Sequence, residues 1–207
     1  MKALLINGSP HAAGCTFTAL SEVAKTLEAN GVATEIFHIG TKPIAGCTAC
    51  GACYKSKQCV IDDAVNALAA RLDEFDAIVL GSPVYYASAN ASLCALCDRL
   101  FYSAGRKMAG KIGAAVVSCR RGGSGDAFDR LNKYFGISNM IVATSQYWNH
   151  IHGNTAEEAM QDAEGLQTMR TLGENIAYLC RLVECGRENG IAPPAYEAKR
   201  ARTNFIR

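Results

Sequence analysis

Four cysteines, Cys47, Cys50, Cys53 and Cys59, lie within a thirteen-residue segment in the spacing C-x2-C-x2-C-x5-C. Thiols two residues apart can converge on one face of a tight loop, and a fourth thiol after a short turn can close a cage around a soft metal centre. A [4Fe–4S] cluster needs four thiolate ligands in this kind of arrangement. The spacing therefore favours a cluster in this segment, residues 46–60, which we call the cysteine loop. A flexible loop of reduced, unliganded thiols is the alternative.

A second C-x2-C pair, Cys94 and Cys97, does not extend this motif. On a helix these two cysteines would share one face with Leu93 and Leu96, so we expect them to pack in the core. Structural zinc usually requires two separated C-x2-C pairs or a mixture of Cys and His, and the chain has no second pair at the right distance. Zinc in the cysteine loop, acting as a structural clip on a nucleotide-binding domain without redox activity, is a further alternative.

A phosphate-binding loop is predicted near the start of the chain. Residues 8–16 read Gly-Ser-Pro-His-Ala-Ala-Gly-Cys-Thr and separate a short apolar strand from a helix. Hydroxyls, backbone N–H groups and the positive end of the helix would together cradle a phosphate. The loop lacks the Lys-Ser/Thr ending of a P-loop, and G-x-G-x-x-G is absent. A mononucleotide phosphate thus fits better than ATP or a dinucleotide, and an ordinary strand–helix turn is the alternative.

Two further loops could complete a site for a planar anion. In residues 81–86, Tyr85 and Tyr86 follow Pro83, and two adjacent tyrosines cannot both point into a core, so this loop offers flat apolar surface for a ring. Residues 118–125 combine Arg120 and Arg121 with a run of glycines at a helix start. These groups would stabilise an anion such as the N1–O2 edge of a reduced flavin, although a flexible polar loop is the alternative.

Alternating strands and helices would bring these loops together. The hydrophobic pattern predicts strands over residues 3–7, 32–39, 77–81, 113–118 and 140–145. It predicts helices over 16–29, 88–104, 126–135 and 156–184, and another that Asp62 or Asp63 would cap. This order implies an α/β fold, with a doubly wound five-stranded parallel sheet covered by helices on both faces. Ligands of such sheets bind at the carboxyl ends of the strands.

Composition limits the other possibilities. The chain has 207 residues, 49% of them hydrophobic, which suits one domain over residues 1–190. A net charge of +2 gives no indication of nucleic-acid or anionic-membrane binding, and the apolar runs are too short to span a bilayer. Ten cysteines without a signal-peptide pattern indicate a reducing cytoplasm.

Residues 191–207 form a predicted extended basic tail, which contains Lys199, Arg200, Arg202 and Arg207. A solvated tail is one interpretation. Packing against a second subunit is the other, and the apolar Phe205 and Ile206 near its end favour it.

Taken together, the three loops resemble the flavodoxin-like NAD(P)H-dependent FMN reductases, and the cysteines narrow the resemblance to the iron–sulfur flavoprotein branch. The resemblance covers essentially the whole chain and is carried by three segments, Gly8-Ser9-Pro10, Gly81-Ser82-Pro83-Val84-Tyr85-Tyr86 and Tyr147-Trp148-Asn149-His150-Ile151-His152-Gly153.

The resemblance implies a site for FMN and a site for a cluster. It places the FMN phosphate on Ser9, His11, Gly14, Cys15 and Thr16. It places the isoalloxazine ring against Pro83, Val84, Tyr85 and Tyr86, and the polar edge of the ring near Ser118, Arg120, Gly122 and Gly123. The implied cluster ligands are Cys47, Cys50, Cys53 and Cys59. His11 and Cys15 stand where the family usually has a basic residue and an asparagine or serine, so we expect weaker phosphate binding.

The expected activity is a flavin oxidoreductase that takes hydride from NAD(P)H and passes electrons to a small acceptor, through the cluster if one is present. No catalytic acid or base is expected, because the cofactor carries the redox chemistry. A homodimer or a dimer of dimers is expected. The alternative is an electron carrier reduced by a ferredoxin-like protein rather than by NAD(P)H.

Overall fold

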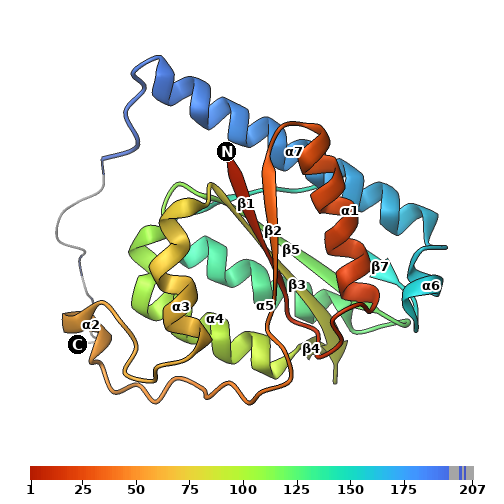
Figure 1. Cartoon of the computed structure of the whole chain (residues 1–207), viewed down its shortest axis with the longest axis horizontal. Helices are drawn as coiled ribbons and strands as arrows, with labels where there is room; N and C mark the ends of the chain where they lie inside the picture. Colours follow the sequence, from red (N-terminus) through yellow and green to blue (C-terminus); the bar gives the residue numbers. More distant parts are fainter. Residues whose placement is uncertain (196–200, 202, 204–207) are drawn as a thin grey trace.

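The computed structural model describes residues 1–195, 201 and 203. Its centre is a parallel sheet in the order β2-β1-β3-β5-β6 (Figure 1). These strands are β1 (Lys2–Asn7), β2 (Ala33–His38), β3 (Ala77–Tyr85), β5 (Ile112–Cys119) and β6 (Ile141–Val142). β7 (His150–His152) also pairs in parallel with β5, and β4 (Ser88–Ala89) forms an antiparallel hairpin with the end of β3. The predicted fold class is confirmed.

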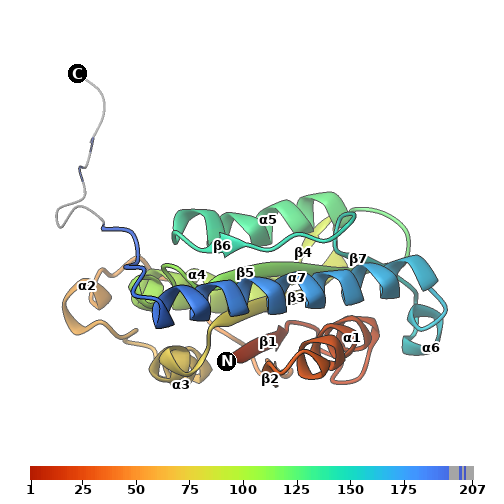
Figure 2. The same ribbon diagram turned by 90° about the horizontal axis from the view of Figure 1, so that it is seen from above.

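Helices cover both faces of the sheet, and Figure 2 shows α1 and α5 on opposite sides. α1 (Cys15–Ala29) and α7 (Ala163–Glu188) pack on the face that includes Ala3 and Leu5. α3 (Ala64–Arg71), α4 (Ala91–Ala104) and α5 (Ser124–Ile137) pack on the face that includes Leu4 and Ile6. Successive strand residues thus enter different cores, which explains why the strands read as continuous apolar runs.

The predicted fifth strand over 140–145 is wrong in part. The sheet contains only the short β6 there, and after Ala143 the chain leaves the sheet until β7. The two pieces pair with opposite ends of β5, at Ile112 and Gly113 and then at Val117 to Cys119. The intervening residues include the exposed Tyr147 and Trp148, so the segment bulges away from the sheet before it returns.

Two predicted helices also have different bounds. The helix expected over 88–104 begins at Ala91, because residues 88–89 form β4 and the Asn90 side chain caps the helix. The helix expected over 156–184 is divided into α6 (Ala156–Ala159) and α7. Asp162 causes the division, since its side chain accepts a hydrogen bond from the N–H of Gly165 and so begins a new helix.

The cysteine loop leaves the carboxyl end of β2 and lies along one end of the molecule (Figure 1). It is mostly exposed coil and contains one short helix, α2 (Cys53–Ser56), which the sequence pattern did not indicate. The loop then returns to α3, which Asp63 caps as expected. Two short 3₁₀ turns, η1 (Leu72–Glu74) and η2 (Gly105–Lys107), follow α3 and α4.

The basic residues and the apolar pair predicted in the tail lie outside the described residues. Within the described part of the chain, we find no helix that combines the length and apolar character needed to cross a membrane.

Candidate cofactor sites

A cavity of about 720 Å³ opens at the carboxyl edge of the sheet. This volume is within the range of small-molecule sites. Most of the predicted FMN residues line it: Ser9, His11, Gly14, Cys15, Thr16, Pro83, Val84, Tyr85, Ser118 and Arg120. The other three predicted residues, Tyr86, Gly122 and Gly123, are not part of its wall.

Asn7 shapes the predicted phosphate loop, although sequence reasoning missed it. Its side chain is fully buried at the end of β1. The carboxamide oxygen accepts a hydrogen bond of 3.1 Å from the N–H of Ser9, and the amide nitrogen donates to the carbonyls of His11 and Ala12 at 3.4 and 3.3 Å. One buried side chain therefore fixes both sides of the loop and leaves the N–H groups at its tip free to face the cavity.

Two helices that follow cavity-lining loops, α1 and α5, begin without a side-chain cap, whereas α6 is capped by Thr155. Side chains cap the N-termini of α3, α4 and α7, but no side chain caps α1 or α5. The N–H groups of Ala12, Ala13 and Gly14 also have no hydrogen-bond partner among the described residues. Uncapped N–H groups at the positive end of a helix bind anions, so this loop suits a phosphate.

Thr16 and Cys15 use their side chains within the protein. The Thr16 hydroxyl lies 2.7 Å from the Ser118 hydroxyl, and both residues are buried. The Cys15 thiol donates to the carbonyls of Gly153 and Thr155 at 3.4 and 3.2 Å. Burial, aided by the nearby Glu158 and Glu157, raises the pKa of this thiol and keeps it a neutral donor. These two side chains position the loop rather than face a phosphate.

Residues 153–155 form a wall of the cavity that was not predicted as part of the site. Gly153 is required there, because a Cβ atom on it would lie 2.6 Å from the backbone nitrogen of Ala159. The sequence signal was present in the segment ending at Gly153, but the short β7 that delivers this segment to the cavity was not recognised.

Arg120 lines the cavity and Arg121 follows it, and neither forms an ion pair within the described ranges 1–195, 201 and 203. Their positive charges are therefore available to an anion. Cys119 is also part of the wall, and burial raises the pKa of its thiol, which remains neutral at physiological pH.

Pro83, Val84 and Tyr85 form an apolar wall of the cavity, and a tight hairpin after them fixes its position. Tyr86 and Ala87 link β3 to β4, and both have positive φ angles, 48° and 57°, as a two-residue hairpin requires. Tyr86 is fully exposed, whereas Tyr85 is about half exposed and lines the cavity. Gly123 packs on this turn with φ of 84°, and a Cβ atom there would lie 2.9 Å from Cα of Ala87. Gly123 thus shapes the site without lining it.

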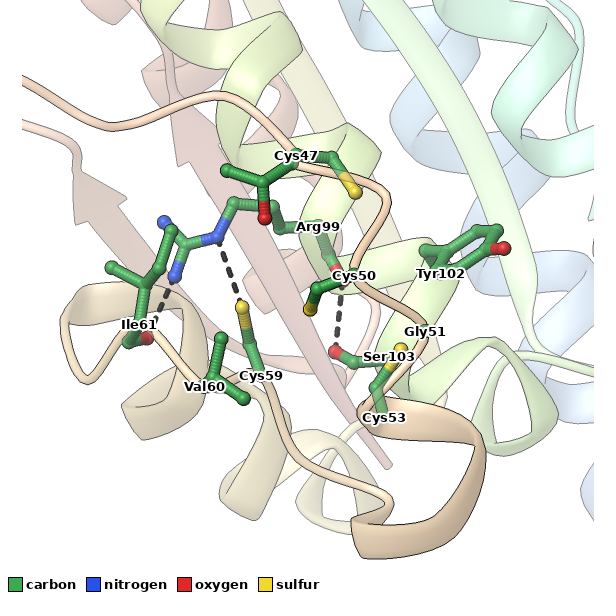
Figure 3. Close-up of a pocket in the computed structure, with 11 residues that line it drawn as sticks. Cys47, Cys50, Gly51, Cys53, Cys59, Val60, Ile61, Arg99, Tyr102 and Ser103 are labelled. Carbon is green, nitrogen blue, oxygen red and sulfur yellow. Dashed lines mark hydrogen bonds between the residues drawn. The ribbon is translucent and has the colours of Figure 1, made fainter.

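The four loop cysteines line a second, smaller cavity, which lies against α4 (Figure 3). All four are free thiols; Cys47 and Cys50 are exposed, and Cys53 and Cys59 are half-buried. Hydrogen bonding from the backbone of Ala52, and then from Thr48, lowers the pKa of Cys50. The structure thus brings together all four predicted ligands.

These four thiols are the donor set that a [4Fe–4S] cluster would use. Among the described residues, no three Cys, His, Asp or Glu side chains are placed to hold one metal ion. A [4Fe–4S] cluster is bound by one thiolate at each of four irons, so its ligands need not meet at one point. The cavity itself is only about 20 Å³, and the coil that carries Cys47 and Cys50 on its wall is exposed.

Arg99 is the main residue of this second site that sequence reasoning missed. It comes from α4 and is 1% exposed, and Figure 3 shows its guanidinium beside Cys59. It pairs with Asp63. Burial acts to raise the pKa of Asp63, but hydrogen bonds from Arg99 and Val65 outweigh burial and leave that pKa lowered. Cys94 and Cys97, by contrast, pack in and against the core as expected.

Comparison with known proteins identifies the family. A family model described as NADPH-dependent FMN reductase matches residues 1–155. The chain belongs to this family. An iron-sulfur flavoprotein of Methanocaldococcus jannaschii is 31% identical over 192 residues, covering 89% of this chain and 100% of the relative. An iron-sulfur flavoprotein of Methanosarcina thermophila is 29% identical over 192 residues, covering 91% and 100%. The predicted family and its branch are thus confirmed.

A solved flavodoxin from the domain Archaea has a TM-score of 0.60 at 19% identity and covers 87% of this chain and 99% of that flavodoxin, which confirms the flavodoxin-like fold of this family member. RosB with a bound riboflavin-phosphate intermediate has a TM-score of 0.70 at 14% identity and covers 99% of this chain and 92% of RosB. An NAD(P)H:quinone oxidoreductase from Methanothermobacter marburgensis has a TM-score of 0.65 at 15% identity, covering 85% and 96%. The family and the fold together make the chain a flavodoxin-like member of an FMN oxidoreductase family.

Proposed function

We propose that this chain is an FMN-dependent oxidoreductase that takes hydride from NAD(P)H, and that its cysteine loop holds a [4Fe–4S] cluster that passes electrons to an acceptor. When bound, FMN would supply hydride acceptance and release of electrons, and the cluster would supply single-electron transfer. The observation that carries the proposal is the cavity at the carboxyl edge, where uncapped N–H groups meet an apolar wall.

The phosphate end of the site would be built from backbone and one histidine. The free N–H groups of Ala12, Ala13 and Gly14 lie at the start of α1, and His11 is exposed beside them. Asn7 holds these groups in place. Since N–H groups at a helix start bind anions without a basic side chain, the loop can hold FMN although it lacks lysine and arginine.

The ring end of the site would be built from apolar and cationic groups. Pro83, Val84 and Tyr85 form one wall, which suits a planar ring. Arg120 lies on the same cavity and has no competing carboxylate among the described residues, so it can stabilise negative charge at the edge of the ring.

The residues around this cavity would position the reactants rather than move protons. No Asp or Glu lines the cavity in the part of the chain that the structure describes. The half-buried thiol of Cys15 and the buried thiol of Cys119 have raised pKa values and stay neutral. Binding, orientation and exclusion of water are therefore the contributions of the protein.

The cluster would be held by Cys47, Cys50, Cys53 and Cys59, which line one cavity as free thiols. The naming of the M. jannaschii and M. thermophila relatives as iron-sulfur flavoproteins supports this assignment. We also propose a homodimer or a dimer of dimers, because the exposed Tyr86 beside the cavity offers apolar surface to a second subunit. Size-exclusion chromatography with light scattering would measure the molar mass in solution. A mass of one chain would contradict this part of the proposal.

Rapid anaerobic mixing with NADH or NADPH tests the hydride reaction. We expect either nucleotide to bleach the flavin absorbance of the FMN-loaded chain, with a rate that saturates as its concentration rises. Tyr85→Ala should lower this rate, while Tyr178→Ala, on an exposed part of α7, should not. If reduced ferredoxin bleached the flavin absorbance and neither NADH nor NADPH did so, the proposal would be contradicted. That result would support the electron-carrier alternative.

A further inference from the structure

The base of the cysteine loop is closed by one buried side chain. The Arg99 guanidinium donates from Nη1 to the carbonyl of Ala45 at 3.3 Å and from Nη2 to the carbonyl of Ile61 at 2.7 Å. Ala45 precedes the first loop cysteine and Ile61 follows the last. A single group on α4 therefore joins the start of the loop to its end.

Asp63 makes this buried charge tolerable and fixes its orientation. Its carboxylate accepts two hydrogen bonds from Arg99, at 2.6 and 2.9 Å, and a third from the N–H of Val65 at 3.0 Å. The carboxylate therefore caps α3 and orients the guanidinium at the same time. A lysine could keep the charge but could not reproduce the planar fork.

Cys59 is held more firmly than the other loop cysteines. Nε of Arg99 donates to its Sγ at 3.2 Å, which completes the use of all five N–H donors of the guanidinium. The buried Asn66 binds its backbone on both sides, accepting from its N–H at 3.1 Å and donating to its carbonyl at 2.9 Å. Cys47 and Cys50 lie in exposed coil. The sulfur of Cys59 is therefore placed before any metal binds.

We propose that Arg99 is the positioning residue of the cluster site: it closes the cysteine loop, presents the Cys59 sulfur, and makes the bound cluster easier to reduce through its Nε–H···Sγ bond. The last effect follows because hydrogen bonds to the sulfurs and nearby positive charge stabilise the more negative, reduced form of a cluster. The inference rests on the proposed cluster, but loop closure can be tested without it.

The first test uses the metal-free chain. Alkylation of each cysteine by iodoacetamide is followed by mass spectrometry in the wild type, Arg99→Lys, Arg99→Met and the control Arg130→Met. Arg130 lies on α5 and pairs with Asp98, which is on α4 together with Arg99. We expect alkylation of Cys59 to accelerate at least tenfold in Arg99→Lys, which opens the loop but keeps a positive charge near the thiol, and to accelerate less in Arg99→Met, which also removes the charge that favours the thiolate. Alkylation of Cys47 and Cys50 should change less than twofold. The control should match the wild type.

Arg99→Lys retains the charge and should fold even if Arg99→Met does not, as circular dichroism would show. An unchanged rate at Cys59 in folded Arg99→Lys would overturn the closure part of the inference.

The second test measures the reduction potential of the reconstituted cluster by a redox titration followed by electron paramagnetic resonance. We expect the equilibrium constant for one-electron reduction of the cluster to be at least tenfold smaller in Arg99→Met than in the wild type. This corresponds to a reduction potential lower by about 59 mV. Arg99→Lys should lie between that variant and the wild type. An equal or higher potential in Arg99→Met would overturn the electrochemical part.

The two tests separate this inference from the proposed function. If the wild-type chain took up no iron under anaerobic reconstitution, the proposed cluster would be wrong, and the electrochemical part would fall with it. Faster alkylation of Cys59 in the Arg99 variants would still establish that Arg99 closes the loop.

Discussion

The hydroxyl of Thr16, at the start of α1, lies 2.7 Å from the hydroxyl of Ser118, near the end of β5. Both residues are buried and both lie on the large cavity. This bond joins the predicted phosphate loop to the loop that carries Arg120. This bond would hold the two ends of the proposed flavin site at a fixed separation before any ligand binds.

Breaking this bond should destabilise the fold and the site together. Thr16→Val keeps the side-chain shape but leaves the Ser118 hydroxyl without its partner, so we expect the free energy of unfolding to fall by about 1.5 kcal/mol. Urea denaturation would measure this loss. The double variant Thr16→Val/Ser118→Ala should lose less than the sum of the two single variants, because the groups interact directly. Strictly additive losses would show that the hydroxyls act independently.

Asn7→Ala should weaken FMN binding more than it weakens the fold. The variant removes the hydrogen bonds that shape residues 9–12, so the free N–H groups would lose their common orientation. We expect the Kd for FMN, measured by quenching of flavin fluorescence, to rise about tenfold, equivalent to ~1.4 kcal/mol. Asn30→Ala, which removes a bond at the opposite end of α1, is the control and should leave the Kd unchanged. Equal Kd values for the two variants would contradict this role of Asn7.

Gly123→Ala should be much more damaging than Gly122→Ala. The first substitution places a Cβ atom 2.9 Å from Cα of Ala87 at a φ of 84°, whereas nothing lies within 4 Å of a Cβ atom on Gly122. We expect Gly123→Ala to lower the free energy of unfolding by about 2 kcal/mol, through overpacking and left-handed backbone strain. Thermal unfolding of the two variants would test the difference, and similar melting temperatures would refute the packing of this loop on the hairpin.

Glu35 should make stability depend on acid pH. Hydrogen bonds from Arg71 and then Lys2 lower its pKa from 4.5 to about 2. Because the folded pKa lies below the unfolded one, the stabilisation is fully present above pH 4.5 and is lost as the pH falls toward 2. Glu35→Gln should therefore cost about 1 kcal/mol at pH 7 and almost nothing near pH 2.

Denaturation at several pH values would measure this dependence. Glu174→Gln is the control, because Glu174 forms no ion pair within the described part of the chain. A loss from Glu35→Gln that stayed constant across the whole acid range would contradict the assigned pKa.

Hydrophobic periodicity predicted the parts of the fold that depend on burial alone. β1, β2, β5, α1 and α3 lie close to where the apolar pattern places them. β3 begins where it was predicted but runs on to Tyr85, four residues beyond the predicted end. The hydrophobic pattern did not predict β6 and β7 as separate strands, because strands of two or three residues are too short to show a recognisable alternation. The hairpin at Tyr86 and Ala87 gave no signal, because neither residue is a usual choice for positive φ.

The site was predictable only where a residue type carries chemistry by itself. The four cysteines and most of the cavity wall were found in this way. Asn7, Asn66 and Arg99 were missed, because an isolated polar residue in a sequence is usually exposed. Each of the three is buried. Asn7 binds backbone groups of the loop that follows its strand, and Asn66 and Arg99 bind backbone groups at the end of the cysteine loop from helices. Such contacts exist only after the sheet and helices have packed.

The central claim is that one chain holds both FMN and a [4Fe–4S] cluster, and metal and flavin analysis of anaerobically purified protein tests it most directly. We expect about four irons, four sulfides and one FMN per chain. Alanine at Cys47, Cys50, Cys53 or Cys59 should remove the iron, while alanine at Cys94 or Cys97 should not. FMN without iron, or iron that survives loss of the loop cysteines, would contradict the account.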